Sequence, residues 1–302
     1  MNNFLFLFVI ALCGTHINSL NVESTNRILG GTPAVETNFR YMISLQERSQ
    51  LSTNTRGHRC GGALVTLRHA VTSASCTLFF RQFFVINATA YRVFAGSVLL
   101  TNDTSADRHR DIEKITVHPN YRPNTPYVND IAVIALVSEF PSHAVSTVGL
   151  AVNDPTTIQG AVCQVSGWGS SDQTSAASTQ LVQMTKTVYD QAPCQAVYSV
   201  PVPGQFQINI IDTMICAIDP LANSCQGDLG NPLVCNSNLN GILIFHRNDC
   251  SEIPIPFPEV YTRISSFRSW IETTAGASTF QPGMAILGLI CIVQIVTTKV
   301  LQ

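Results

Sequence analysis

Short runs of β-branched and apolar residues, separated by turn-forming residues, occupy the chain between residues 28 and 265. Strands at this spacing predict an all-β barrel or sandwich. The chain has 302 residues, of which 45% are hydrophobic, so it can bury the core of one large β domain or of two smaller ones. The clearest runs are Met42 to Leu45, Ala63 to Val65, Tyr91 to Phe94, Ile131 to Leu136 and Ile242 to Phe245.

The end of this region has a helical pattern instead. Phe267, Trp270 and Ile271 recur at spacings of three and four residues, and therefore share one face of a helix predicted from Ser265 to Thr274.

The first residues are typical of a secretory signal. Phe4 to Leu12 form an apolar segment, and small and polar residues follow from Cys13 to Ser19. The segment lacks the usual basic residue at its start, and a buried N-terminal helix or strand is the alternative interpretation. We expect a signal peptide at residues 1–19, cleaved after Ser19, and a short propeptide at residues 20–27.

Ten cysteines in a secreted chain indicate a disulfide framework rather than a metal site. Cys13 would leave with the signal peptide and Cys291 with the C-terminal tail, so that eight remain. Eight cysteines allow about 100 pairings, and their number alone does not select one. Sequons at Asn87 and Asn102 predict glycosylation in the same pathway. We expect no metal and no cofactor.

The charge composition excludes one class of partner. Only 12% of the residues are charged, with 17 Lys and Arg against 19 Asp and Glu, which gives a net charge of -2. No basic face is available for a phosphate backbone, and nucleic acid is therefore not an expected partner.

The C-terminal tail, residues 275–302, differs from the rest of the chain. Its apolar run from Met284 to Val296 is broken only by Gln294, and small residues precede it from Ala275 to Ser278. A helix over this run would reach about 20 Å, less than the roughly 30 Å of a bilayer core. Small residues, a short spacer and an apolar end match a GPI-attachment signal, and hence a membrane tether. A tail that is trimmed or stays unattached is the alternative.

Five segments carry a more specific pattern: Arg27 to Gly31, Cys60 to Leu64, Asn129 to Ala132, Val165 to Gly169 and Gly227 to Pro232. In their order and separations, they resemble the trypsin/chymotrypsin-type serine proteases (peptidase S1). The resemblance covers residues 28–274, which we expect to form one peptidase-like domain. It implies two six-stranded antiparallel β-barrels followed by a short C-terminal helix.

The same resemblance implies one disulfide pairing, with none of the eight remaining cysteines left over. The expected bridges are Cys60–Cys76, Cys163–Cys235, Cys194–Cys216 and Cys225–Cys250.

In an active family member a serine attacks, a histidine takes its proton and a buried aspartate orients the histidine. By resemblance these positions are Leu229, Ser75 and Asp130. A leucine cannot attack a carbonyl, so we expect the chain to be inactive as a protease. His69 is not expected to replace the missing base, because the interval from Cys60 to Cys76 has the family's length and leaves no room for a register shift.

Asp130 is expected to be retained for structure rather than catalysis. Its histidine partner has become Ser75, and the serine that would also bond it has become Ile244. A buried carboxylate that loses donors should have a raised pKa or admit water.

The positions of the specificity pocket change as well. Asn223 stands at the floor, which is an aspartate in family members that select Lys or Arg, and Glu259 replaces a glycine. Asn231, also at a usual glycine position, adds bulk beside the loop. We expect bulky groups to fill or close the pocket. The altered pocket positions are Asn223, Ile244, Phe245, His246 and Glu259.

The activation site retains the family's pattern. In the family, cleavage after an arginine frees an isoleucine α-amino group, which pairs with the aspartate before the serine; here these residues are Arg27, Ile28 and Asp228. Ser44 and His58 occupy the positions that hold this aspartate before cleavage in some zymogens. A working switch and an inherited relic are both consistent with the pattern.

These features predict a secreted or surface-tethered, non-catalytic protease homologue that binds an extracellular protein such as a protease, an inhibitor or a receptor. One alternative is a residual or unusual serine-type endopeptidase that uses Ser75 or Ser224, neither of which has an expected base partner. Another is a structural or decoy protein that sequesters inhibitors, which a closed pocket disfavours.

Overall fold

The computed structural model describes residues 31–79, 84–102, 104–123, 127–152, 158–170, 177–200, 208–246 and 257–276. The predicted signal peptide and propeptide lie outside these ranges, as do the C-terminal tail beyond Gly276 and the residues Arg27, Ile28 and Cys250. Within the described ranges, no helix is long and apolar enough to cross a membrane.

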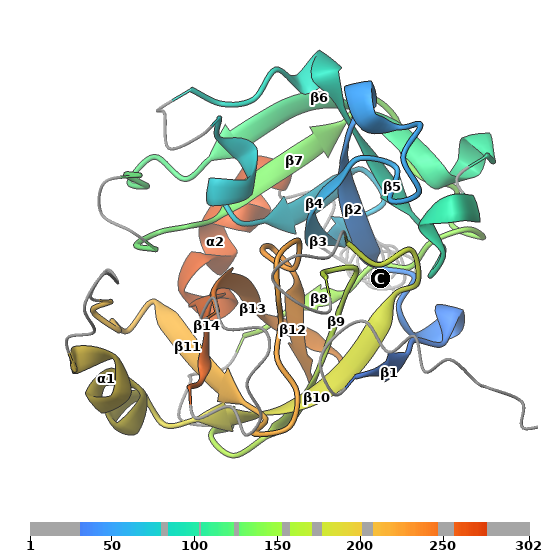
Figure 1. The fold of residues 1–302 in the computed structure, drawn as a ribbon. Helices are drawn as coiled ribbons and strands as arrows, with labels where there is room; N and C mark the ends of the chain where they lie inside the picture. Colours follow the sequence, from blue (N-terminus) through green and yellow to red (C-terminus); the bar gives the residue numbers. More distant parts are fainter. Residues whose placement is uncertain are drawn as a thin grey trace, which may run out of the picture.

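The first half of the chain forms a closed barrel, drawn from blue to green in Figure 1. Its strands follow the order β2-β3-β4-β7-β6-β5, and every neighbouring pair is antiparallel. Apolar side chains such as Ile43, Leu64 and Ile134 fill the interior. The strands are β2 (Met42–Glu47), β3 (His58–Thr66), β4 (His69–Thr72), β5 (Tyr91–Ala95), β6 (His109–Val117) and β7 (Ala132–Leu136).

The second half forms another six-stranded antiparallel barrel, in the order β10-β11-β14-β13-β12-β9 with β9 closing onto β10. Two short strands extend it: β1 (Thr32–Pro33) pairs with β10, and β8 (Gly149–Leu150) pairs with β13. The prediction of two six-stranded barrels is therefore confirmed. The strands are β9 (Val162–Gly167), β10 (Val182–Tyr189), β11 (Met214–Ile218), β12 (Pro232–Cys235), β13 (Asn238–Phe245) and β14 (Glu259–Arg263).

The predicted C-terminal helix is α2 (Ile264–Ala275), which buries Phe267 and Ile271 as expected. A second helix, α1 (Gln191–Ser199), was not predicted. Only Cys194 of this helix is buried, so it has little apolar periodicity, and Pro193 stands in its first turn, where a missing N–H is tolerated. The short 3-10 helices are η1 (Glu36–Asn38), η2 (Arg48–Gln50), η3 (Ser75–Thr77), η4 (Ala88–Ala90), η5 (Leu100–Asn102) and η6 (Ala106–Arg108).

A shared hydrophobic cluster joins the two barrels and α2. It includes Met42 and Val71 from the first barrel, Ile242 from the second, and Phe267 from the helix. Trp168 lies fully buried in the same cluster, and its indole N–H donates to the carbonyl of residue 98 at 3.1 Å. The site described next lies where these two barrels meet.

Three of the four expected disulfides are present, and each should stabilise the fold by about 2 to 4 kcal/mol. The fourth expected pair includes Cys250, which lies outside the described residues. The bridges are Cys60–Cys76, Cys163–Cys235 and Cys194–Cys216.

Candidate functional site

The loop between β11 and β12 reaches across to the first barrel. The N–H of Gly61 donates to the carbonyl of Leu229 at 2.9 Å, which ties the loop to β3. Gly230 has a φ of +83°, and a Cβ at this position would lie 2.4 Å from the Gly61 carbonyl oxygen and from Thr72 Oγ1. Only glycine therefore fits this close approach between the barrels.

Ser75 and Asp130 are neighbours, as the resemblance implies. The Ser75 N–H donates to Asp130 Oδ1 at 2.7 Å, while the Ser75 hydroxyl donates to Ser73 Oγ at 3.2 Å. Asp130 is fully buried, and its Oδ2 has no hydrogen-bond partner among the residues that the structure describes. Burial raises the pKa of Asp130 to about 6, although the Ser75 N–H acts in the opposite direction. The raised pKa agrees with the loss of donors expected at this position.

Leu229 is partly buried, and its side chain packs against the hydrophobic core of the second barrel. It has no group that can act as a nucleophile. His69, at the start of β4, bonds Thr66 in its own hairpin at 2.9 Å, and Ser224 is fully buried. Among the described residues, His69 forms no hydrogen bond with Ser75 or Ser224, so neither serine has a histidine base.

Asp228 lies fully buried with three hydrogen-bond donors. Oδ1 accepts from the Gly169 N–H and from Asn231 Nδ2, and Oδ2 accepts from the Cys225 N–H, each at 2.8 Å. No cationic side chain within the described ranges forms an ion pair with it. Burial raises the pKa of Asp228 to about 7, while the donors lower it.

Asn231 does more than add bulk beside this loop. Its Nδ2 is one of the donors to Asp228, and its side chain is fully buried. A Cβ at Gly61 would lie 1.7 Å from Asn231 Oδ1, so the glycine of the facing strand makes room for the amide. The sequence prediction treated Asn231 as a steric change and missed its hydrogen bond.

Ser44 and His58 bind the loop at a backbone carbonyl, and not at the Asp228 carboxylate that the zymogen resemblance implies. Burial lowers the pKa of His58 to about 4, so the ring is neutral near pH 7. Its Nε2 donates to the carbonyl of Gly227 at 3.0 Å, which leaves Nδ1 to accept from the Ser44 hydroxyl at 2.7 Å. The pair therefore holds the Gly227 backbone rather than the Asp228 carboxylate.

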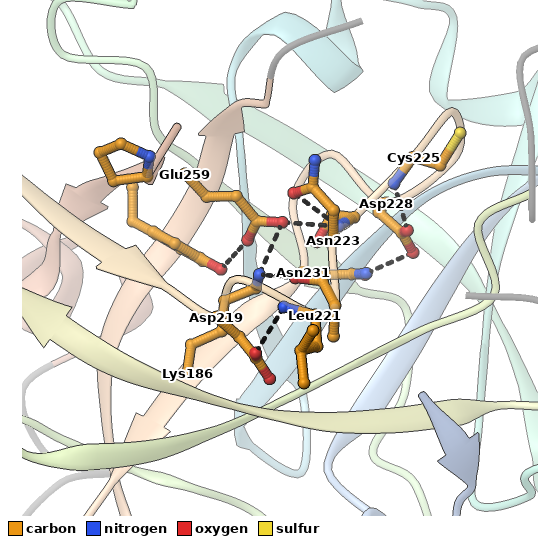
Figure 2. A network of polar contacts seen from close by, with 12 residues as sticks. Lys186, Asp219, Leu221, Asn223, Cys225, Asp228, Asn231 and Glu259 are labelled. Atoms are coloured by element: carbon orange, nitrogen blue, oxygen red, sulfur yellow. Dashed lines mark hydrogen bonds and ion pairs between the residues drawn. The ribbon is translucent and has the colours of Figure 1, made fainter. Parts of the chain in front are cut away.

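A buried charge network adjoins the loop, as Figure 2 shows. Lys186 Nζ lies 3.2 Å from Glu259 Oε1 and donates to the Ala222 carbonyl at 2.8 Å. Glu259 also accepts from the Ser224 N–H at 2.6 Å and from the Tyr261 hydroxyl. Glu259 was expected to block the pocket by its bulk, and it is also the acidic partner of an ion pair inside the second barrel.

The other pocket positions are also packed. Ile244 belongs to a cluster with Met214 and Cys216, and Phe245 contacts the rings of Tyr127 and Tyr198 at centroid distances of 5.0 and 5.7 Å. His246 is buried, and Asn223 is buried with its Oδ1 accepting from the Ser224 N–H at 3.1 Å. No group of three or more His, Cys, Asp and Glu residues in the described part of the chain is placed to hold a metal ion.

Comparison with known proteins decides the family. A family model described as Trypsin matches residues 28–271. The chain belongs to the trypsin family. Trypsin beta of Drosophila erecta is 32% identical over 268 residues, which make up 88% of this chain and 95% of that protein. A chymotrypsin-like serine proteinase of Haliotis rufescens is 30% identical over 272 residues, 88% of this chain and 98% of that one.

Solved structures place the chain in the same family. Neuropsin, a serine protease expressed in the limbic system of mouse brain, is similar with a TM-score of 0.67 and 27% sequence identity. The match covers 82% of this chain and 100% of neuropsin. This trypsin-family chain therefore spans nearly the whole length of the relatives named here.

Lys186 is the residue of this trypsin-family site that sequence reasoning missed. It alternates with Val182, Met184 and Val188 along β10, and all four side chains are buried. A lysine in phase with inward apolar positions indicates a buried ammonium, which requires a partner. The partner, Glu259, stands 73 positions later on β14 and could not be identified from this pattern.

Both predicted glycosylation positions of this trypsin-family chain lie on the surface. Asn87 and Asn102 are exposed, and Asn87 Oδ1 accepts from the N–H and the hydroxyl of Thr89 at 3.1 and 2.9 Å. Glycosylation of the two residues stays a prediction.

Proposed function

We propose that this trypsin-family protein is a non-catalytic homologue that acts by binding another protein outside the cell. The observation that supports this most strongly is Leu229, a hydrocarbon side chain packed at the position of the family's nucleophile. Ser75 at the position of the base supports it as well, because loss of one member of the triad already costs active enzymes several orders of magnitude in rate.

Reaction with a serine-directed fluorophosphonate tests the loss of catalysis. The expected result is no labelling of the purified mature protein, with active trypsin as the positive control and a heat-unfolded sample as the background. Labelling that requires the native fold would overturn the proposal. It would favour the one alternative that the relatives' names support, a serine-type endopeptidase with residual activity.

Binding is the second half of the proposal. The partner is an extracellular protein such as a protease, an inhibitor or a receptor, and it is to be captured on the immobilised mature protein from the fluid in which the protein occurs. The capture is run with chain that has been cleaved after Arg27 and with an uncleavable Arg27→Gln variant. A partner that binds both forms equally would show that binding does not require cleavage.

We also infer that cleavage after Arg27 supplies the cation that Asp228 lacks among the described residues. The Ile28 α-amino group would then enter as a positive charge beside a fully buried carboxylate whose pKa burial has raised. The three hydrogen bonds already on Asp228 orient its carboxylate for such a pair, which supports a retained switch over a relic.

Secretion and a GPI tether are part of the same proposal, on the sequence of residues 1–19 and 275–302. Release of the protein from intact cells by a phosphatidylinositol-specific phospholipase is the expected result. Protein that stays on the cells after this treatment, or that is found only in the medium, would contradict the tether.

A further inference from the structure

The ion pair of Lys186 and Glu259 lies inside the apolar core of the second barrel. Both side chains are at most 2% exposed, and the strands that carry them, β10 and β14, flank β11 in the same sheet. Glu259 stands opposite Ala217 of β11, whose side chain belongs to that core. An ammonium and a carboxylate at such depth are tolerated only when each has a charged or hydrogen-bonding partner.

Both charged groups have such partners. Glu259 receives the Lys186 ammonium, the Ser224 N–H and the Tyr261 hydroxyl, and the ammonium also donates to the Ala222 carbonyl. Burial by itself would raise the pKa of Glu259, but the ammonium and these donors outweigh it and bring the pKa below the ordinary carboxyl value. The carboxylate is therefore ionised near neutral pH, with a resident cation.

This pair lies close to the surface although it is buried. Ala222, whose carbonyl binds the ammonium, follows Leu221, which is 62% exposed. Asp219 holds the Leu221 N–H at 2.9 Å, and Figure 2 shows this short segment beside the lysine. The carbonyl that binds the ammonium therefore belongs to a segment that reaches the surface at Leu221.

We propose that Lys186 is a built-in occupant of a cation site formed by the Glu259 carboxylate and the Ala222 carbonyl, and that it excludes basic groups from outside. The site would otherwise take a guanidinium, an amidine or an alkylammonium group, because its acceptors already hold an ammonium. A second cation would meet the positive charge of Lys186 at short range, which disfavours it strongly in a buried setting.

The exclusion of basic groups depends on where the acidic residue Glu259 stands in this chain. Asn223, at the predicted pocket floor, is neutral, whereas Glu259 carries a carboxylate that could attract a basic side chain. With Lys186 in place, the pair of Lys186 and Glu259 carries no net charge. A partner that binds the protein would then be recognised outside this pocket. Basic residues on that partner would gain no binding free energy from the pocket. The inference does not depend on the existence of such a partner, since a small cation tests it.

Equilibrium binding of p-aminobenzamidine, followed by its fluorescence, tests the proposal. The wild-type protein is expected to show no saturable binding. Lys186→Met keeps the side-chain stem and removes the charge, and should bind saturably, with a Kd at least about tenfold below the highest ligand concentration at which the wild type shows no saturation. The gain should disappear in the Lys186→Met/Glu259→Gln double variant. Lys114→Met, which removes an exposed lysine of the first barrel, is the matched control and should bind as the wild type does.

Two results would overturn the proposal: saturable binding by the wild type, or a folded Lys186→Met variant without a gain. Where Lys186→Met does not fold alone, its refolding is followed by circular dichroism with and without benzamidine. Folding rescued by benzamidine supports the site, because the external cation then replaces the ammonium. Failure of rescue, with the double variant folding normally, means that an outside cation cannot reach Glu259 and refutes the proposal.

Discussion

Cleavage after Arg27 should change how the stability of this protein depends on pH. Burial raises the pKa of Asp228 from 3.8 to about 7 as long as no α-amino group pairs with it, which is the state expected for the uncleaved chain. A carboxyl group whose pKa is higher in the folded than in the unfolded state stabilises the fold while it is protonated. The free energy of unfolding therefore falls as the pH rises from about 4 to about 7, because the unfolded chain loses its proton first.

The magnitude follows from the same two values. Their separation corresponds to up to about 4 kcal/mol of stability lost by the uncleaved chain above pH 7. Once Ile28 is a free N-terminus, its α-amino group can balance the charge of Asp228 and lower the pKa. The cleaved form should then keep most of that free energy at neutral pH.

The assay is urea unfolding of cleaved and uncleaved protein at several pH values between about 4.5 and 7.5, where each α-amino group is mostly protonated. Asp130, whose pKa is also raised, contributes to both forms and cancels in the difference. Asp228→Asn, which cannot ionise, should abolish the difference and serves as the control. Parallel pH profiles of the two forms would refute the switch and leave the Arg27–Ile28 pattern as a relic.

Three further predictions follow from contacts in and around the site. Asn231→Ala removes a donor from the buried Asp228 carboxylate and should lower the free energy of unfolding by about 1 to 3 kcal/mol, measured with urea. Asp130→Asn should remove the part of the pH dependence that lies between about pH 4 and pH 6, and unchanged profiles would contradict its raised pKa. Replacing Cys163 and Cys235 by alanine should cost about 2 to 5 kcal/mol, with a lower thermal midpoint as the readout.

Much of the fold was predictable because it depends on local patterns and on cysteines. The runs at Met42 and Ile242 lie in strands, since short β-branched segments between turn formers have few other ways to bury their apolar faces. Helix α2 was predicted from the spacing of Phe267 and Ile271. Helix α1 was missed, because only Cys194 of its residues is buried and it has no apolar stripe.

The site was predictable where one residue decides the chemistry and unpredictable where two residues meet. Leu229 and Ser75 are informative alone, since neither side chain can do what the family's residue does. Lys186 and Glu259 lie on strands separated in sequence, and only the three-dimensional arrangement shows that they neutralise each other. The same holds for His58, whose bond to the Gly227 carbonyl rather than to the nearby carboxylate depends on the ring's orientation.

Two buried carboxylates hold adjacent backbone amides of the same loop, and they differ in electrostatic state. The Ser224 N–H donates to Glu259, which forms an ion pair with Lys186, whereas the Cys225 N–H donates to Asp228, which has no cation among the described residues. Cleavage can therefore strengthen the hydrogen bond of the Cys225 N–H without altering that of the Ser224 N–H. Residue-resolved hydrogen exchange should show slower exchange at Cys225 after cleavage and the same rate at Ser224. Equal slowing at both positions would mean that cleavage orders the whole loop at once. In that case the ion pair of Lys186 and Glu259 does not already hold the Ser224 amide in place before cleavage.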